Sequence, residues 1–379
     1  MVRPFFLLLV IALAAGAAGC VGASHRTAAE RAPGTSNDPP RQHAKPKPRP
    51  AGPFAQPLGA PHLAPGSDPS VLPGDVLIAD RSNNRLLVVD PRGRIVWRFP
   101  QPGDRQGLPL PDDAFFSPDG RQIVATEEDV DVVSVIDVAS RRIVWHYGAV
   151  NVPGSGANRL AHPDDALLLP NGSIVLADIE NCRLLVLHPP AHRPVRSAGS
   201  PANGCVHDPP SAWGSPNGAF PLAGGGTLVT EINGDWVDAL SPSGGFLWST
   251  HPPGISYPSD SNEVRPGLYV TVGWQSPGTL ETFDRHGRVH WRYRPRAGAP
   301  PLDHPSLALP LPNGDFLVND DSNDRVIVVD PHTNRVVWQY GHTGVPGTAG
   351  GFLSRPDGVD LVPPAALLTR LHARIRLPG

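Results

Sequence analysis

The chain has 379 residues and a formal net charge of −3 at pH 7, so no overall basic field would draw it to nucleic acid. Hydrophobic residues make up 40% of the chain, which is enough for a sizeable core, and the length allows one to three domains. The 48 prolines and 40 glycines are typical of a turn-dense β protein or of disordered tracts.

Residues 1–20 have the pattern of a signal peptide. Arg3 provides a short basic region, and the apolar run that follows it ends in small residues just before Cys20. This end resembles a bacterial lipoprotein box, although Ala17 stands where that motif usually has leucine. We therefore predict lipidation at Cys20, with ordinary cleavage or a retained membrane anchor as alternatives. Each alternative places the protein outside the bacterial cytoplasm, either tethered to the outer face of the membrane or secreted.

Residues 21–70 are dense in proline, contain a basic stretch at 45–49, and have no apolar clusters. Such a segment cannot bury enough apolar surface to fold, so we predict a disordered linker. It would hold the domain that follows clear of a membrane.

Residues 71–364 repeat a unit of four short apolar runs separated by turn residues, most clearly in 304–341. The fourth runs contain a column of large side chains: Trp97, Trp145, Arg196, Trp248, Trp291 and Trp338. A proline precedes each first run: Pro111, Pro163, Pro216, Pro258, Pro305 and Pro356. These columns run in step and predict an all-β protein, a six-bladed β-propeller. We expect the tryptophans to pack between neighbouring blades.

The ends of the repeat region predict a closed ring. Residues 145–164 and 338–357 align without a gap, so a first strand should follow at 359–362, where the repeats end. The first unit begins at 72–75 without such a strand. The C-terminal strand is therefore expected to complete the N-terminal blade, which removes an exposed sheet edge. Residues 365–379 form a short tail with apolar residues at helical spacing.

Two cysteines lie within the repeats, Cys182 and Cys205. In an oxidising compartment an even pair indicates a disulfide, and two free thiols are the alternative. The pair lies near Arg196, which replaces the tryptophan of blade 3, so we expect that junction to pack differently.

Three segments resemble the second hairpin of NHL-repeat propellers: residues 79–93, 177–187 and 319–330. Residues 115–144 are similar to YncE-like surface propellers. The Leu-Pro-Asn-Gly segments at 169–172 and 311–314 are similar to arylsulfotransferase-type propellers and to quinoprotein repeats. The resemblance covers 71–364 and implies a six-bladed fold, which hosts enzymes and scaffolds alike.

Residues that lead into the first strands should converge at the mouth of the central channel. We predict that the acidic and amide side chains there bind a ligand: Asp112, Asp113, Asp164, Asp165, Asn217, Asp260 and Asp357. His162 and His304 belong to opposite blades of the ring, and Arg355 lies in the same column. Carboxylates and amides suit Ca²⁺, whereas two imidazoles with a carboxylate suit Zn²⁺. The alternative is that these Asp and Asn residues only stabilise turns.

Two functional hypotheses follow. The first is an exported, membrane-tethered module that binds a small molecule or a protein at the channel mouth. The second is an enzyme at the same site. Resemblance to arylsulfotransferases implies a histidine as sulfate acceptor, for which His304 or His162 with Arg355 is the nearest match; a metal-dependent hydrolase or lyase is the other possibility. The chain has no phosphate-cradling glycine motif, HExxH motif or serine elbow.

Overall fold

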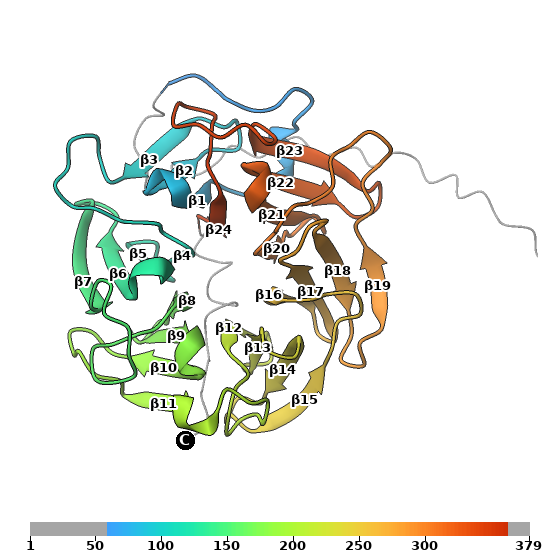
Figure 1. Ribbon diagram of the computed structural model, residues 1–379. Helices are drawn as coiled ribbons and strands as arrows, with labels where there is room; N and C mark the ends of the chain where they lie inside the picture. The colour runs from blue at the N-terminus through green and yellow to red at the C-terminus, as the bar shows by residue number, and fades with distance from the viewer. Residues whose placement is uncertain (1–58, 363–379) are drawn as a thin grey trace, which may run out of the picture. The chain divides into compact units, whose positions relative to one another are not determined.

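The computed structural model describes residues 59–362 (Figure 1). Within this range 24 strands form six antiparallel four-stranded sheets arranged as blades around a central axis. This confirms the predicted six-bladed, all-β propeller. The predicted signal peptide, the lipidation site at Cys20, residues 21–58 of the predicted linker and the C-terminal tail lie outside the described residues. No helix in the described part of the chain is both long and apolar enough to cross a membrane.

Each blade contains four strands, which follow one another from the axis outward. Blade 1 consists of β24 (Pro356–Leu361), β1 (Val76–Asp80), β2 (Arg85–Val89) and β3 (Ile95–Phe99). Blade 2 consists of β4 (Ala114–Phe116), β5 (Gln122–Glu127), β6 (Val132–Asp137) and β7 (Arg142–Gly148). Blade 3 consists of β8 (Pro163–Leu168), β9 (Ile174–Asp178), β10 (Arg183–Leu187) and β11 (Arg196–Gly199).

The second half of the ring repeats the same order. Blade 4 consists of β12 (Pro216–Pro221), β13 (Thr227–Glu231), β14 (Trp236–Leu240) and β15 (Phe246–Thr250). Blade 5 consists of β16 (Pro258–Arg265), β17 (Leu268–Gly273), β18 (Thr279–Phe283) and β19 (Val289–Arg292). Blade 6 consists of β20 (Ala308–Pro310), β21 (Phe316–Asp320), β22 (Arg325–Asp330) and β23 (Arg335–Gly341).

The ring closes as predicted. Strand β24, the last of the chain, pairs antiparallel with β1, with Val76 opposite Leu361 and Ile78 opposite Val359. The C-terminal strand of the repeat region thus forms the innermost strand of the N-terminal blade, so that β1 has no unpaired edge. Figure 1 shows the red β24 beside the blue β1.

Two outer-strand tryptophans join neighbouring blades. The indole N–H of Trp97 in blade 1 donates to the carbonyl of Val138 in blade 2 at 3.0 Å. Trp338 in blade 6 donates in the same way to Pro91 in blade 1 at 2.9 Å, and both rings are fully buried. Trp248 and Trp291 are only half-buried. The packing role predicted for the whole column is therefore strongest on either side of the closure.

Four second strands end in a single 3₁₀ turn, and in three of these blades a buried ion pair fixes the turn. These turns are η2 (Arg81–Asn83), η3 (Glu128–Val130), η4 (Ile179–Asn181) and η6 (Asp321–Asn323); η1 (Pro69–Val71) and η5 (Pro201–Asn203) lie elsewhere. In blade 1 the Asp80 carboxylate accepts from Asn83 in the turn at 2.9 Å and from Arg85 at 2.6 Å. Blades 3 and 6 repeat these bonds with Asp178 and Asp320.

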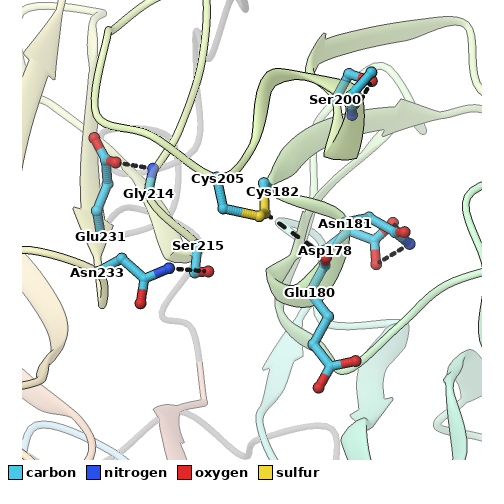
Figure 2. The surroundings of a disulfide bond; sticks show 11 residues. Asp178, Glu180, Asn181, Cys182, Ser200, Cys205, Gly214, Ser215, Glu231 and Asn233 are labelled. Carbon is cyan, nitrogen blue, oxygen red and sulfur yellow. Dashed lines mark hydrogen bonds between the residues drawn. A yellow bond between two sulfur atoms is a disulfide. The ribbon is translucent and has the colours of Figure 1, made fainter.

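Figure 2 shows a disulfide between Cys182, which follows η4, and Cys205 in the loop that leads to blade 4. Cys182 has a left-handed backbone, φ 51°. At the matching position, Asn84 of blade 1 and Asp131 of blade 2 each use a side-chain oxygen to hold the next blade through a backbone N–H. The disulfide thus stands where other junctions have a side-chain hydrogen bond.

Candidate functional site: an acidic channel mouth

The residue before each column proline has a left-handed backbone, with φ between 47° and 59°: Leu110, His162, Ser215, Tyr257, His304 and Arg355. A residue before proline ordinarily prefers an extended backbone, so this conformation needs support from its surroundings. In several blades the support is a hydrogen bond from its N–H to a side chain of the preceding blade. Tyr257 donates to Asp235 at 2.8 Å and Arg355 donates to Asp324 at 3.0 Å. These hydrogen bonds fix where the chain enters the innermost strand of each blade, at the same position of the repeat.

The two residues after each proline form two layers in the channel. The first layer lines a cavity of about 350 Å³: Asp357, Asp112, Asp164, Asn217, Ser259 and Ser306 in ring order. The second layer consists of the next residues in the chain: Gly358, Asp113, Asp165, Gly218, Asp260 and Leu307. All seven residues predicted to bind a ligand therefore lie together in the channel.

Three carboxylates meet in the second layer. Ligand oxygens of Asp113, Asp165 and Asp260 lie within 4.8 Å of one another, and all three residues are buried. Gly218 makes room for them, since a Cβ at this position would collide with the carboxylates of Asp165 and Asp260. A second set of carboxylate oxygens within 4.8 Å consists of Asp112, Asp113 and Asp164. Asp113 connects the two sets.

Several oxygens of this cluster have no hydrogen-bond donor. Both carboxylate oxygens of Asp165 and both of Asp260 are buried without a partner, and so is the amide oxygen Oδ1 of Asn217. These residues are 1–2% exposed, so bulk solvent does not reach them. A buried acceptor left unmatched costs about 1–3 kcal/mol, and more when it is charged. The arrangement therefore favours a ligand that supplies positive charge.

Burial governs the electrostatics of the deep carboxylates. Desolvation, followed by repulsion from neighbouring carboxylates, raises the pKa of Asp113, Asp164 and Asp165 well above the ordinary range. Desolvation also raises the pKa of Asp260 to about 7. These groups hold protons near neutral pH unless a cation takes their place.

Sequence reasoning missed the cation that neutralises the upper layer, Arg81. Its guanidinium contacts Asp112 and lies 2.9 Å from Asp357, 3.0 Å from Glu128 and 2.8 Å from Asp129. Burial disfavours the Arg81 cation, but attraction by Asp357 and Glu128 outweighs it, and its pKa lies above the ordinary value.

Arg81 and Glu128 occupy the first position of the 3₁₀ turns after the second strands. The other residues in this column are Ile179, Ile232, Trp274 and Asp321, and Trp274 also lines the cavity. Because residue type changes from blade to blade, no repeated motif marked this column. Its regular spacing after the second strand was the signal that could have found it.

The two predicted histidines lie beside residues that line the cavity but do not line it themselves. His162 is 43% exposed and lies 3.9 Å from Glu128 and 3.8 Å from Glu180. His304 is hydrogen-bonded to Asp303 at 2.6 Å and contacts the Trp274 ring edge-on. Neither lines the central cavity, whereas Arg355 does. The predicted carboxylates and Arg355 thus lie in the channel, whereas His162 lies at its rim within 4.8 Å of Glu128 and Asp129.

The donor set fits a hard cation. Ca²⁺ takes six to eight oxygen ligands at roughly 2.3–2.6 Å, so oxygens sharing one ion lie within about 5 Å of one another. Both carboxylate sets meet this limit. Zn²⁺ prefers nitrogen and sulfur ligands, and neither deep set contains a histidine or cysteine. The residues of the channel therefore suit Ca²⁺ better than Zn²⁺.

Comparison with known proteins agrees with this architecture. Residues 200–356 match a family described as outer membrane protein assembly factor BamB, a quinoprotein-repeat family. No curated protein matches this chain. A protein of unknown function from Bacteroides caccae superposes with a TM-score of 0.54 at 15% identity, covering 76% of this chain and 98% of its own. A chain from a crystal structure of the nidogen/laminin complex superposes with a TM-score of 0.54 at 13% identity. The match covers 75% of this chain and 97% of that one.

The closed ring, the repeated four-stranded unit and the family match together indicate the class of protein. The chain is a six-bladed β-propeller, and residues 200–356 of it are similar to a quinoprotein-repeat family. The NHL-type relationship stays a prediction.

Proposed function

We propose that the protein is an exported, membrane-tethered binding module whose channel mouth holds a hard divalent cation beneath a small-molecule or protein ligand. The observation that carries this proposal is the set of buried, donor-free oxygens on Asp165, Asp260 and Asn217. Arg81 neutralises the upper carboxylates, but among the described residues no arginine or lysine forms an ion pair with Asp113, Asp165 or Asp260.

The cavity above the cluster is of suitable size and chemistry for a ligand. Its volume of about 350 Å³ lies in the range of small-molecule sites. Tyr257 and Trp274 form one wall, with ring centroids 5.2 Å apart, and Arg355 adds a cationic group at the rim. A ligand with an anionic or hydroxyl oxygen could bind the cation and Arg355 together while its apolar part contacts the aromatic wall. A protein side chain inserted from a partner would meet the same groups.

The outer location rests on the leader and on one comparison. Residues 1–20 have the signal-peptide pattern with Cys20 at its end, and the family matched by residues 200–356 is described as an outer membrane assembly factor. That description also supports a protein partner. A lipid at Cys20 would tether the propeller through the proline-rich segment.

An enzyme at the same site is the second candidate. A bound divalent cation beside Arg355 could polarise a substrate, as metal-dependent hydrolases and lyases require. Sulfotransfer through His304 or His162 has less support, since neither side chain lines the cavity.

Calcium titration of the purified protein by calorimetry tests the proposal. We expect one Ca²⁺ to bind to the EDTA-treated protein and to stabilise it against heat; at 100 times the Kd the gain is about 2.7 kcal/mol. The double variant Asp165→Asn/Asp260→Asn should lose this response. It should fold without calcium at least as stably as the wild type, because neither buried side chain can then ionise in a site where burial disfavours the charged form.

The matched control is Asp119→Asn, at a turn in blade 2 where the side chain is 58% exposed. It should bind Ca²⁺ as the wild type does. A wild-type protein that shows no heat of binding and no thermal shift with Ca²⁺ or Mg²⁺ would contradict the cation site.

A further inference from the structure

Blade 4 breaks the ion-pair rule of the repeats. In blades 1, 3 and 6 the carboxylate that ends the second strand pairs with an arginine opposite it in the register: Asp80 with Arg85, Asp178 with Arg183, and Asp320 with Arg325. In blade 4 the carboxylate is Glu231, and the residue opposite it is Trp236. The guanidinium that balances this carboxylate in blades 1, 3 and 6 is therefore missing.

A second buried carboxylate adds to the imbalance. Asp238 lies opposite Val229, and the matching positions in blades 1, 3 and 6 are Leu87, Leu185 and Ile327. Glu231 and Asp238 are both 0% exposed. Asp238 Oδ1 accepts a hydrogen bond from Ser249, but Oδ2 has no partner. Two carboxylates thus occupy a place where blades 1, 3 and 6 have one carboxylate and its arginine.

His207 faces both carboxylates from the loop that contains Cys205. Its Nδ1 lies 2.8 Å from Glu231 Oε1 and 3.9 Å from the unpartnered Asp238 Oδ2. The ring stacks on Trp236, with centroids 4.1 Å apart and planes at 6°. The imidazole is thereby held flat against the indole with one nitrogen directed at the acids, and 22% of its side chain is exposed.

We propose that His207, Glu231 and Asp238 form a transition-metal site of the Zn²⁺ type, separate from the channel. The three ligand atoms lie within 4.8 Å of one another. Tetrahedral Zn²⁺ with bonds of about 2.0–2.1 Å places its ligand atoms roughly 3.3–3.4 Å apart. The two distances from His207 Nδ1 lie on either side of this value, so a small shift would complete the geometry. One divalent ion, a neutral imidazole and two carboxylates also sum to zero charge. The fourth position would be open to water or a ligand at the exposed edge of His207.

The disulfide supports this site from the loop side. Cys205 is two residues before His207, and its bond to Cys182 fixes the loop to blade 3. Figure 2 shows Glu231 accepting from the backbone N–H of Gly214 in the stretch that follows this loop. Reduction would remove this covalent tie between blade 3 and the loop that carries His207. Metal affinity at this site should therefore depend on the oxidised disulfide.

Cobalt substitution tests the proposal, since tetrahedral Co²⁺ absorbs visible light far more strongly, and at longer wavelength, than octahedral Co²⁺. The full chain, without an affinity tag containing histidine, would be stripped with chelator and titrated with Co²⁺ in excess Ca²⁺, which keeps the channel carboxylates occupied. We expect one tetrahedral Co²⁺ per chain, displaced by Zn²⁺, together with a change in tryptophan fluorescence from Trp236. Reductant should weaken binding.

His207→Gln and Asp238→Asn should each lower the affinity by more than the roughly 10–100-fold typical of an outer-shell change. His251→Gln is the matched control, because His251 contacts the same indole at 3.5 Å but is not part of the cluster. It should keep the full signal, and so should Asp165→Asn/Asp260→Asn, which separates this site from the channel site. Absence of a tetrahedral spectrum in the oxidised wild type, or its survival in folded His207→Gln, would overturn the proposal.

Discussion

Loss of the Arg81 guanidinium should strongly destabilise the propeller. The side chain is 12% exposed and contacts carboxylates of 6–17% exposure on β24 and at the mouth of blade 2. Arg81→Met keeps most of the apolar stem but leaves Asp112, Asp357 and Glu128 without their counterion. Breaking one partner of a buried ion pair typically costs about 3–5 kcal/mol, because the remaining charge stays buried. We expect a loss of this size.

Urea unfolding followed by tryptophan fluorescence in EDTA would measure the loss. Arg121→Met is the control, since this arginine is 83% exposed and lies 3.7 Å from Asp119; an exposed pair of this kind contributes roughly 0–1 kcal/mol. Adding Asp357→Asn to Arg81→Met should recover part of the lost stability by removing one stranded charge. If Arg81→Met unfolds at the wild-type urea concentration, the mouth carboxylates do not depend on Arg81 and the electrostatic reasoning is wrong.

Three further predictions concern other parts of the ring. Burial raises the pKa of Glu127 to about 7 against an ordinary 4.5, so its contribution to stability is present at acid pH and lost as pH rises through this window. Between pH 5 and 8 the free energy of unfolding of the wild type should fall by about 2–3 kcal/mol more than that of Glu127→Gln, measured by urea unfolding at each pH. Trp338→Ala at the ring closure should lower the free energy of unfolding by about 3–5 kcal/mol, measured by thermal denaturation. Trp248→Ala should lower it clearly less, because the Trp248 ring is only half-buried. Equal losses would refute the special role of the closure. Gly218→Ala should destabilise by roughly 1–3 kcal/mol and abolish Ca²⁺ binding in calorimetry, because its Cβ collides with Asp165 and Asp260; unchanged binding would place the cation elsewhere.

Most of the fold could be predicted from the residues that recur at the same position of each repeat. Turn residues and apolar runs fix each blade locally, and the ungapped match between residues 145–164 and 338–357 was enough to predict that β24 pairs with β1. The same column predicted which carboxylates converge, because position after the proline fixes the layer in the channel. Asp112 and Asp113 thus enter successive layers, as their neighbours in other blades do.

The position of His162 and His304 in the repeat did not determine the direction of their side chains. His162 and His304 hold the same column position as Arg355, and all three have positive φ. That backbone is unusual before proline, so its effect on side-chain direction was not predictable from residue type. His304 is hydrogen-bonded to Asp303, whereas Arg355 lines the cavity. Arg81 was missed for a different reason: its partners Asp112, Glu128 and Asp357 come from two other segments of the chain.

The most direct test of the cation site is anomalous diffraction from crystals of the protein grown with Mn²⁺, an oxygen-preferring ion that can replace Ca²⁺. We predict one strong anomalous peak on the propeller axis, with oxygen ligands from Asp113, Asp165 and Asp260. A well-ordered channel with no peak, in which the same carboxyl groups bond to one another through shared protons, would contradict it.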